Sequence, residues 1–170
     1  MTEFKYGIFA SFVLFIWKII EYTLIVPNLH ETGSYIGFVS LIIPAVGIFL
    51  GIKERREKSN FGYISFGEAF RSGVVISLIM AVSIVFFIYG YFKFINPNYV
   101  NYLAAEVEKT LLNRNAARQE INANLDFIKY QFNFYQQIIQ QFLIVLLGGI
   151  AISYIVSMLL KKHQSGEPAS

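Results

Sequence analysis

The chain alternates four long apolar stretches with polar segments. The apolar stretches cover, by residue number, about 6–26, 35–52, 70–95 and 137–160. A transmembrane helix needs about 20 mostly apolar residues, because a helix rises about 1.5 Å per residue and the hydrocarbon core is about 30 Å thick. The pattern therefore predicts an all-α membrane protein with four transmembrane helices. We expect a single domain over residues 1–160 and a short cytoplasmic tail at 161–170.

The first apolar stretch resembles a secretory signal peptide in position but not in composition. It is longer than the apolar region of such a peptide and contains Lys18 and Glu21. No small-residue cleavage site follows it. We therefore expect it to be retained as the first span.

A different periodicity marks the polar segment between the third and fourth stretches. Its apolar residues, at helical spacings of four or three, are Tyr99, Leu103, Val107 and Leu111, then Ile121, Leu125, Ile128, Phe132 and Tyr135. Such spacings place apolar side chains on one face of a helix. They predict an extracytoplasmic amphipathic helical hairpin at about residues 98–136, whose second arm continues unbroken into the fourth span. Either this hairpin packs on the protein surface, or it is a dedicated docking arm.

Lysine and arginine are distributed unevenly between the predicted loops. The basic residues near span ends are Lys5, then Lys53, Arg55, Arg56 and Lys58, and finally Lys161 and Lys162. The connection between the first two spans, PNLHETGS, contains none. Because short cytoplasmic loops carry an excess of Lys and Arg, both termini are predicted to be cytoplasmic.

The composition fits a chain that faces lipid and narrows the possible chemistry. Hydrophobic residues make up 55% of the 170 residues and charged residues only 15%, against about a quarter in soluble domains. There is no cysteine, which excludes disulfides, thiolate metal sites and cysteine nucleophiles. The sequence contains no phosphate-binding glycine loop and no paired acids or nucleophile–base set. We therefore expect no enzymatic activity, no cofactor and no metal.

Small residues recur at four-residue spacing in two of the predicted spans. The third span carries Gly73, Ser77 and Ala81, and the second carries Gly47 and Gly51. Small residues at this spacing let two helices approach closely in a membrane. They indicate either packing within the bundle or contact with a second copy or a partner subunit.

Ionisable residues inside the first span are candidates for a binding site. Lys18 and Glu21 are three residues apart and meet on one helical face, and Lys93 near the end of the third span is positioned to join them. Charges at such depth are costly and therefore pair or face a polar interior. One interpretation is a site for an anion, a lipid headgroup or a proton. The other is a structural ion pair, with Lys18 reaching the interface beside Trp17.

Two further polar groups allow more than one interpretation. The residues Gln136, Gln137, Gln140 and Gln141 form a patch at the entry to the fourth span. They either line a cavity or make interfacial hydrogen bonds. The basic run KERREK, with Arg56, is a topology anchor first and a lipid-phosphate site second.

The stretch SFGEAFRSG marks the start of the third span. Ser65 followed by Glu68 is a capping box, so a helix should begin near Phe66 and run to about Ile95. Two further expectations concern the residues around this start. Phe66 and Phe70 should be buried while Arg71 faces headgroups, and Gly62 and Gly67 should permit a close backbone approach.

Three motifs in this order, GIKERR, SFGEAFRSG and YFKFINP, resemble a bacterial family of small four-span membrane proteins known only as a domain of unknown function. The matching positions are Gly51, Lys53, Arg56, Phe66, Gly67, Ala69, Phe70, Gly73, Asn96 and Pro97. The segment 99–130 matches no familiar pattern. The resemblance implies the bacterial inner membrane, and an association with a membrane glycosyltransferase acting on polyprenyl-phosphate lipids.

The sequence thus favours a non-enzymatic accessory or scaffold subunit that packs against membrane lipids and a larger membrane protein or a second copy, with no nucleic acid. The alternative is a small transporter or lipid-binding protein that uses Lys18, Glu21 and Lys93.

Overall fold

The computed structural model describes residues 2–25, 39–59 and 62–162, and every regular element in this part of the chain is a helix. The elements are α1 (Thr2–Ile20), the π-helical turn η1 (Glu21–Ile25), α3 (Val39–Ser59), α4 (Phe66–Gly90), the π-helical turn η2 (Tyr91–Ile95), α5 (Tyr99–Asn113), α6 (Arg118–Gln131) and α7 (Phe134–Leu160). The prediction of an all-helical fold is confirmed for these residues.

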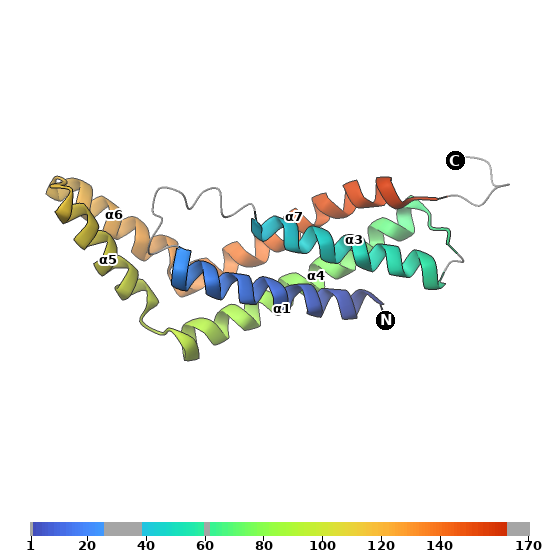
Figure 1. The fold of residues 1–170 in the computed structure, drawn as a ribbon, viewed down its shortest axis with the longest axis horizontal. Coiled ribbons are helices and arrows are strands. Elements are labelled where there is room, and N and C mark those ends of the chain that lie inside the picture. The colour runs from blue at the N-terminus through green and yellow to red at the C-terminus, as the bar shows by residue number, and fades with distance from the viewer. Residues whose placement is uncertain (1, 26–38, 60–61, 163–170) are drawn as a thin grey trace.

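Four helices lie lengthwise beside one another as a bundle, and α5 and α6 extend from one end of it as an antiparallel pair (Figure 1). Within the bundle α7 packs mainly against α4, while α1 contacts both α3 and α4. The start of α1 lies at the other end of the bundle (Figure 1). The segment before α4 is tied to the segment after α7 by paired backbone hydrogen bonds between Ile64 and Lys162.

Three helical segments in the described part of the chain are long and apolar enough to cross a membrane. They are Thr2–Ile25, Phe66–Ile95 and Phe134–Leu160. The second predicted span begins at residues 35–38, which lie outside the described residues, as do residue 26 of the first span, the connection 27–34 and most of the tail. The remainder of that span forms the first part of α3, which continues as helix through the basic run to Ser59.

Small residues allow α4 and α7 to approach closely. A Cβ atom added to Gly73 of α4 would lie 2.6 Å from Cβ of Ser153, and one added to Gly149 of α7 would lie 2.6 Å from Cβ of Ser77. Each helix thus offers a glycine to the other's serine. The Ser77 hydroxyl donates to the Gly73 carbonyl (2.8 Å) and the Ser153 hydroxyl to the Gly149 carbonyl (2.6 Å). These four residues define the α4–α7 seam, in which each hydroxyl is satisfied by its own helix.

The remaining predicted packing residues also face helices of this chain. Gly47 lies against Ala10 of α1, and Gly51 lies against Ile76 of α4. Ala81 is fully buried. The small-residue positions are therefore occupied within the bundle.

The capping box at the start of α4 is confirmed. The Glu68 amide donates to the Ser65 hydroxyl (3.3 Å), and the Ser65 amide donates to the Glu68 carboxylate (3.0 Å). The expected close approach at Gly62 and Gly67 is wrong, because a Cβ at either position would meet open space. Gly62 instead adopts a φ of +87°, a conformation that favours glycine.

The two phenylalanines at this helix start are half-buried rather than fully buried. Phe66 and Phe70 stack on each other, and both meet the ring of Tyr154 edge-on. Arg71, one residue further along α4, is exposed.

The α5–α6 pair follows the predicted periodicity but ends differently. Leu103 and Val107 of α5 and Ile121 and Ile128 of α6 are buried. The prediction that the second arm continues into the last span is wrong, because α6 ends at Gln131 and α7 begins at Phe134. The Asn133 side chain caps α7 by accepting from the Tyr135 amide (3.0 Å), a local bond that competes with continuous helix. The break turns Tyr135 outward, where it is 73% exposed.

A charged cluster joins α1 and α3 at the end of the bundle away from α5 and α6. The Glu54 carboxylate accepts hydrogen bonds from Lys5 (2.7 Å), Tyr6 (2.6 Å) and Lys58 (2.9 Å). These three donors lower the pKa of Glu54 to about 2. The cluster therefore remains ionised at neutral pH and holds the basic end of α3 against α1.

Candidate functional site

The Lys18–Glu21 pair forms at the junction between α1 and the π-helical turn η1. The Lys18 ammonium lies 2.9 Å from Oε2 of Glu21, and Lys18 is only 6% exposed. The predicted pairing is confirmed, but Lys18 is covered by protein rather than extended into the surroundings. From α3, the Ser40 hydroxyl donates a long hydrogen bond to the same Glu21 oxygen (3.4 Å) and accepts from Nε1 of Trp17 (3.1 Å).

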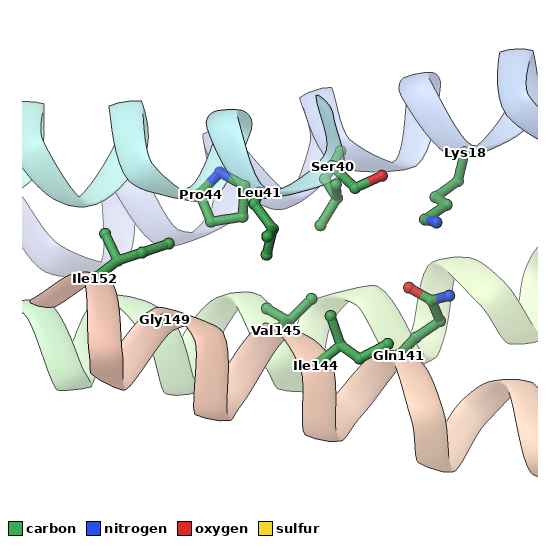
Figure 2. A pocket seen from close by; sticks show the side chains of 10 residues that line it. Lys18, Ser40, Leu41, Pro44, Gln141, Ile144, Val145, Gly149 and Ile152 are labelled. Atoms are coloured by element: carbon green, nitrogen blue, oxygen red, sulfur yellow. The ribbon is translucent and has the colours of Figure 1, made fainter. Parts of the chain in front are cut away.

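A cavity of about 100 Å³ lies beside this pair, between α1, α3 and α7. Its lining consists of Leu14, Lys18, Ser40, Leu41, Pro44, Gln141, Ile144, Val145, Gly149 and Ile152. Figure 2 shows the side chains of Lys18 and Gln141 pointing toward one another into the same gap at one end. The polar groups of the lining thus gather at one end, and apolar side chains line the rest.

Pro44 adds a backbone acceptor to this region. Proline has no N–H, so the carbonyl four residues before it, that of Ser40, lacks its normal helical donor. Both residues line the cavity. The α3 wall therefore carries the Ser40 hydroxyl and a backbone carbonyl released from the helical pattern.

The glutamines at the start of α7 differ in how they are satisfied. Gln137 accepts from the Tyr22 hydroxyl (2.7 Å) and donates to the Gln131 carbonyl (2.8 Å), and Gln140 accepts from the Gln131 amide (3.1 Å). Gln141 is only 8% exposed and makes no hydrogen bond to another described residue, but its amide atoms reach the cavity and are not among the covered, unpartnered polar atoms, which are the Tyr91 and Tyr99 hydroxyls. The predicted polar patch therefore divides into two bonded glutamines, a partly covered Gln136 and a buried amide that faces a cavity.

An aromatic cluster packs the two π-helical turns together next to the ion pair. The Tyr22 ring of η1 lies 5.2 Å from those of Tyr91 in η2 and Tyr99 in α5. Burial raises the pKa of the Tyr99 phenol, whose hydroxyl has no partner in the part of the chain that the structure describes. Single π-helical turns are frequent at functional sites, and two of them meet in this cluster.

The structure does not bring the other predicted site residues to this place. Lys93 is exposed and lines a separate hollow with Tyr89, Phe92, Pro97, Val100 and Phe134. It contributes nothing to the cavity beside Lys18. Arg56 donates to the Leu160 carbonyl (3.3 Å) and lies 4.0 Å from Glu57, so it ties α3 to the end of α7.

Sequence reasoning did not single out Ser40, and it treated Gln141 as one of four equivalent glutamines. A signal was present: serine and proline four residues apart within an apolar span mark a polar interruption of that helix. The relative rotation of α1, α3 and α7, which brings these residues to Lys18, is set by packing between helices.

The described polar groups at this cavity are mainly hydrogen-bond donors. Its ionisable groups among the described residues, Lys18 and Glu21, neutralise each other at 2.9 Å. An ammonium has three N–H donors and the Gln141 amide has two, whereas the acceptors include the Gln141 amide oxygen and the Ser40 carbonyl. Lys18 uses one donor on Glu21. The cavity end is therefore rich in donors and close to neutral in net charge.

Comparison with known proteins adds the family but no activity. No curated protein and no solved structure matches the chain. A family model matches residues 5–162, nearly the whole chain. The chain therefore belongs to DUF4199, a family of proteins of unknown function.

Proposed function

We propose that this protein is a non-catalytic accessory or scaffold subunit of a larger complex in the bacterial inner membrane. It crosses the membrane four times with both termini in the cytoplasm, and the α5–α6 pair lies on the extracytoplasmic side as a docking arm. Its partner is a larger membrane protein, with a glycosyltransferase acting on polyprenyl-phosphate lipids as the first candidate from the family resemblance.

The charge distribution supports this topology. Basic residues gather at one end of the bundle. Lys5 donates to the Glu54 carboxylate and Arg55 pairs with Glu3. Arg56 donates to the Leu160 carbonyl, and the backbone of Lys162 pairs with that of Ile64. A basic end agrees with a cytoplasmic location. The predicted second span, in α3, lies lengthwise in the bundle beside α1, α4 and α7 (Figure 1).

The proposal of a docking arm rests on a second apolar face of α6. Ile121 and Ile128 face α5 and are buried, whereas Phe127 and Tyr130 are 61% and 66% exposed. The latter two are three residues apart and therefore adjacent on the helix surface. Exposed aromatic residues of this kind are enriched at the centres of protein interfaces. The arm reaches beyond the bundle, which places this face where a partner's extracytoplasmic part would meet it (Figure 1).

Partner capture tests the proposal. Changing Phe127 and Tyr130 together to serine should abolish capture of the partner from native membranes by the tagged full-length chain, while its melting temperature in detergent stays unchanged. The matched control replaces Tyr102 and Leu112, exposed apolar residues of α5, with serine. Quantitative mass spectrometry should recover a polyprenyl-phosphate glycosyltransferase with the parent and the control but not with the α6 variant. Equal recovery with all three chains would exclude this face as the docking surface.

A further inference from the structure

We propose that the cavity beside Lys18 binds the carbonyl head of an acyl-chain lipid, with its chain lying between α3 and α7. The site is separate from the α5–α6 arm, so this inference stands or falls independently of the docking role. It assigns a specific ligand chemistry to the buried Lys18–Glu21 region.

The unsatisfied hydrogen-bonding groups define the head of the ligand. Lys18 retains two N–H donors after its bond to Glu21, and the buried Gln141 amide has no partner among the described residues. Both groups line the cavity, so an occupant that accepts from both gains two hydrogen bonds there. Carboxyl and ester carbonyls are compact acceptors of this kind. Because Glu21 neutralises Lys18, a free inorganic anion would gain little net attraction.

The shape of the cavity defines the rest of the ligand. Along α7 the lining runs from Gln141 to Ile152, and the eleven helical rises between them correspond to about 16 Å. Only the Lys18 end carries polar side chains, and the wall beyond it includes Leu41 and Ile144 (Figure 2). Both of these side chains are exposed at the surface of the bundle, so the cavity opens sideways toward the bilayer. Ordered water would satisfy the polar end but would have no partners along the apolar wall.

An amphiphile matches this polarity along the helix axes. Its carbonyl head lies near the end of α1, the first few methylenes fill the cavity of about 100 Å³, and the rest of the chain leaves through the lateral opening between Leu41 and Ile144. Two sources supply this chemistry in a membrane: a free fatty acid and an acyl ester of a bilayer phospholipid. Both place the same carbonyl and chain in the site.

Two variants and two matched controls test the proposal. Gln141→Leu removes the unpaired amide while keeping its approximate volume, and Gln136→Leu makes the same change outside the cavity. Ile144→Trp blocks the opening from an exposed position, where the larger side chain has room, and Leu147→Trp makes a similar change at an exposed α7 position that does not line the cavity.

The full chain is reconstituted into vesicles of phosphatidylethanolamine and phosphatidylglycerol containing a palmitate with a diazirine in its chain. A second arm uses phosphatidylglycerol with the same diazirine acyl chain. After illumination, mass spectrometry locates the cross-links. They should concentrate at residues 41–44 and 144–152 in at least one arm, and excess unlabelled lipid of the same type should compete.

Gln141→Leu and Ile144→Trp should each lower this labelling by about fivefold or more, the loss expected for one hydrogen bond or a blocked entry. Gln136→Leu and Leu147→Trp should leave it unchanged. Labelling in the palmitate arm identifies a fatty acid, and labelling confined to the phospholipid arm identifies a bilayer ester. Labelling spread evenly over the exposed faces of the bundle, or labelling that survives both cavity variants, would overturn the proposal.

Discussion

The two sides of α7 treat polar groups in opposite ways. On the α4 side, Ser77 and Ser153 lie in a close contact made possible by Gly73 and Gly149, and each hydroxyl bonds to a carbonyl of its own helix. On the α3 side, Gln141 is 8% exposed, finds no partner among the described residues and lies beside a cavity.

This difference follows from the reach of the side chains. A serine hydroxyl can return to the carbonyl four residues earlier, so it is satisfied without any neighbour and leaves the helix surface flat enough for close contact. A glutamine amide extends away from its helix and must find its partner elsewhere. A helix bundle can therefore close fully over serine and glycine, whereas a buried glutamine needs a partner from another segment, as Gln137 finds in Tyr22 and Gln141 does not among the described residues.

The largest predicted effect on stability comes from the Lys18–Glu21 ion pair and not from the α4–α7 seam. Lys18→Met should destabilise the protein by about 3 kcal/mol, because it leaves the Glu21 carboxylate covered and unpaired. The double variant Lys18→Met with Glu21→Gln should recover most of this loss, since no buried charge remains. Denaturant titration in detergent, followed by circular dichroism, measures both. A single variant as stable as the parent would show that Glu21 is solvated rather than held by Lys18.

Adjacent glycines on α7 test the contrast directly. Gly149→Ala should cost about 2 kcal/mol, because its Cβ would lie 2.6 Å from Cβ of Ser77 and the two helices would have to separate. Gly148→Ala should be neutral or slightly stabilising, since its Cβ would meet only Leu41 at 3.5 Å and alanine favours helix. The same denaturant titration compares them. Equal stabilities would mean that the seam is loose enough to accept a methyl group.

Gln141→Leu should change the free energy of unfolding by less than Gly149→Ala does, and it should raise it. In lipid-free detergent it should stabilise the protein by about 1 kcal/mol, because it replaces an amide that faces the cavity with apolar contact. Ser153→Ala, its counterpart on the seam side, should instead be neutral or mildly destabilising, since its hydroxyl is already bonded. Destabilisation by Gln141→Leu in the absence of lipid would reveal a hydrogen bond that the amide makes within the protein.

Features that depend on neighbouring residues could be predicted from the sequence, and those that depend on helix rotation could not. The capping box of Ser65 and Glu68 and the Lys18–Glu21 pair each span three residues, so one helical turn determines them. The break at Asn133 was missed because the apolar stripe runs across it, while a single side-chain cap decides the boundary. Lys93 lies near the end of its span, as expected, but only tertiary packing decides which hollow it faces.

The smallest expected effect concerns the clamp that holds α3, one wall of the cavity, against α1. Lys5, Tyr6 and Lys58 lower the pKa of Glu54 from 4.5 to about 2, so the ionised carboxylate is favoured in the folded state. A carboxylate whose pKa is lower in the folded than in the unfolded protein stabilises the fold. This stabilisation is complete at pH values above the pKa of the unfolded state, and it is lost as the pH falls through the pKa of the folded state. The melting temperature of the parent should therefore exceed that of Glu54→Gln by a constant amount between pH 7 and about 5, and the difference should shrink between pH 4.5 and 2.

Lipid labelling of the cavity should weaken over the same pH range in the parent, and labelling of Glu54→Gln should not change over that range. A difference in melting temperature that persists unchanged down to pH 2.5 would show that the Glu54 contacts do not depend on its charge, and the α3 wall would then owe its position to the apolar contact between Gly47 and Ala10.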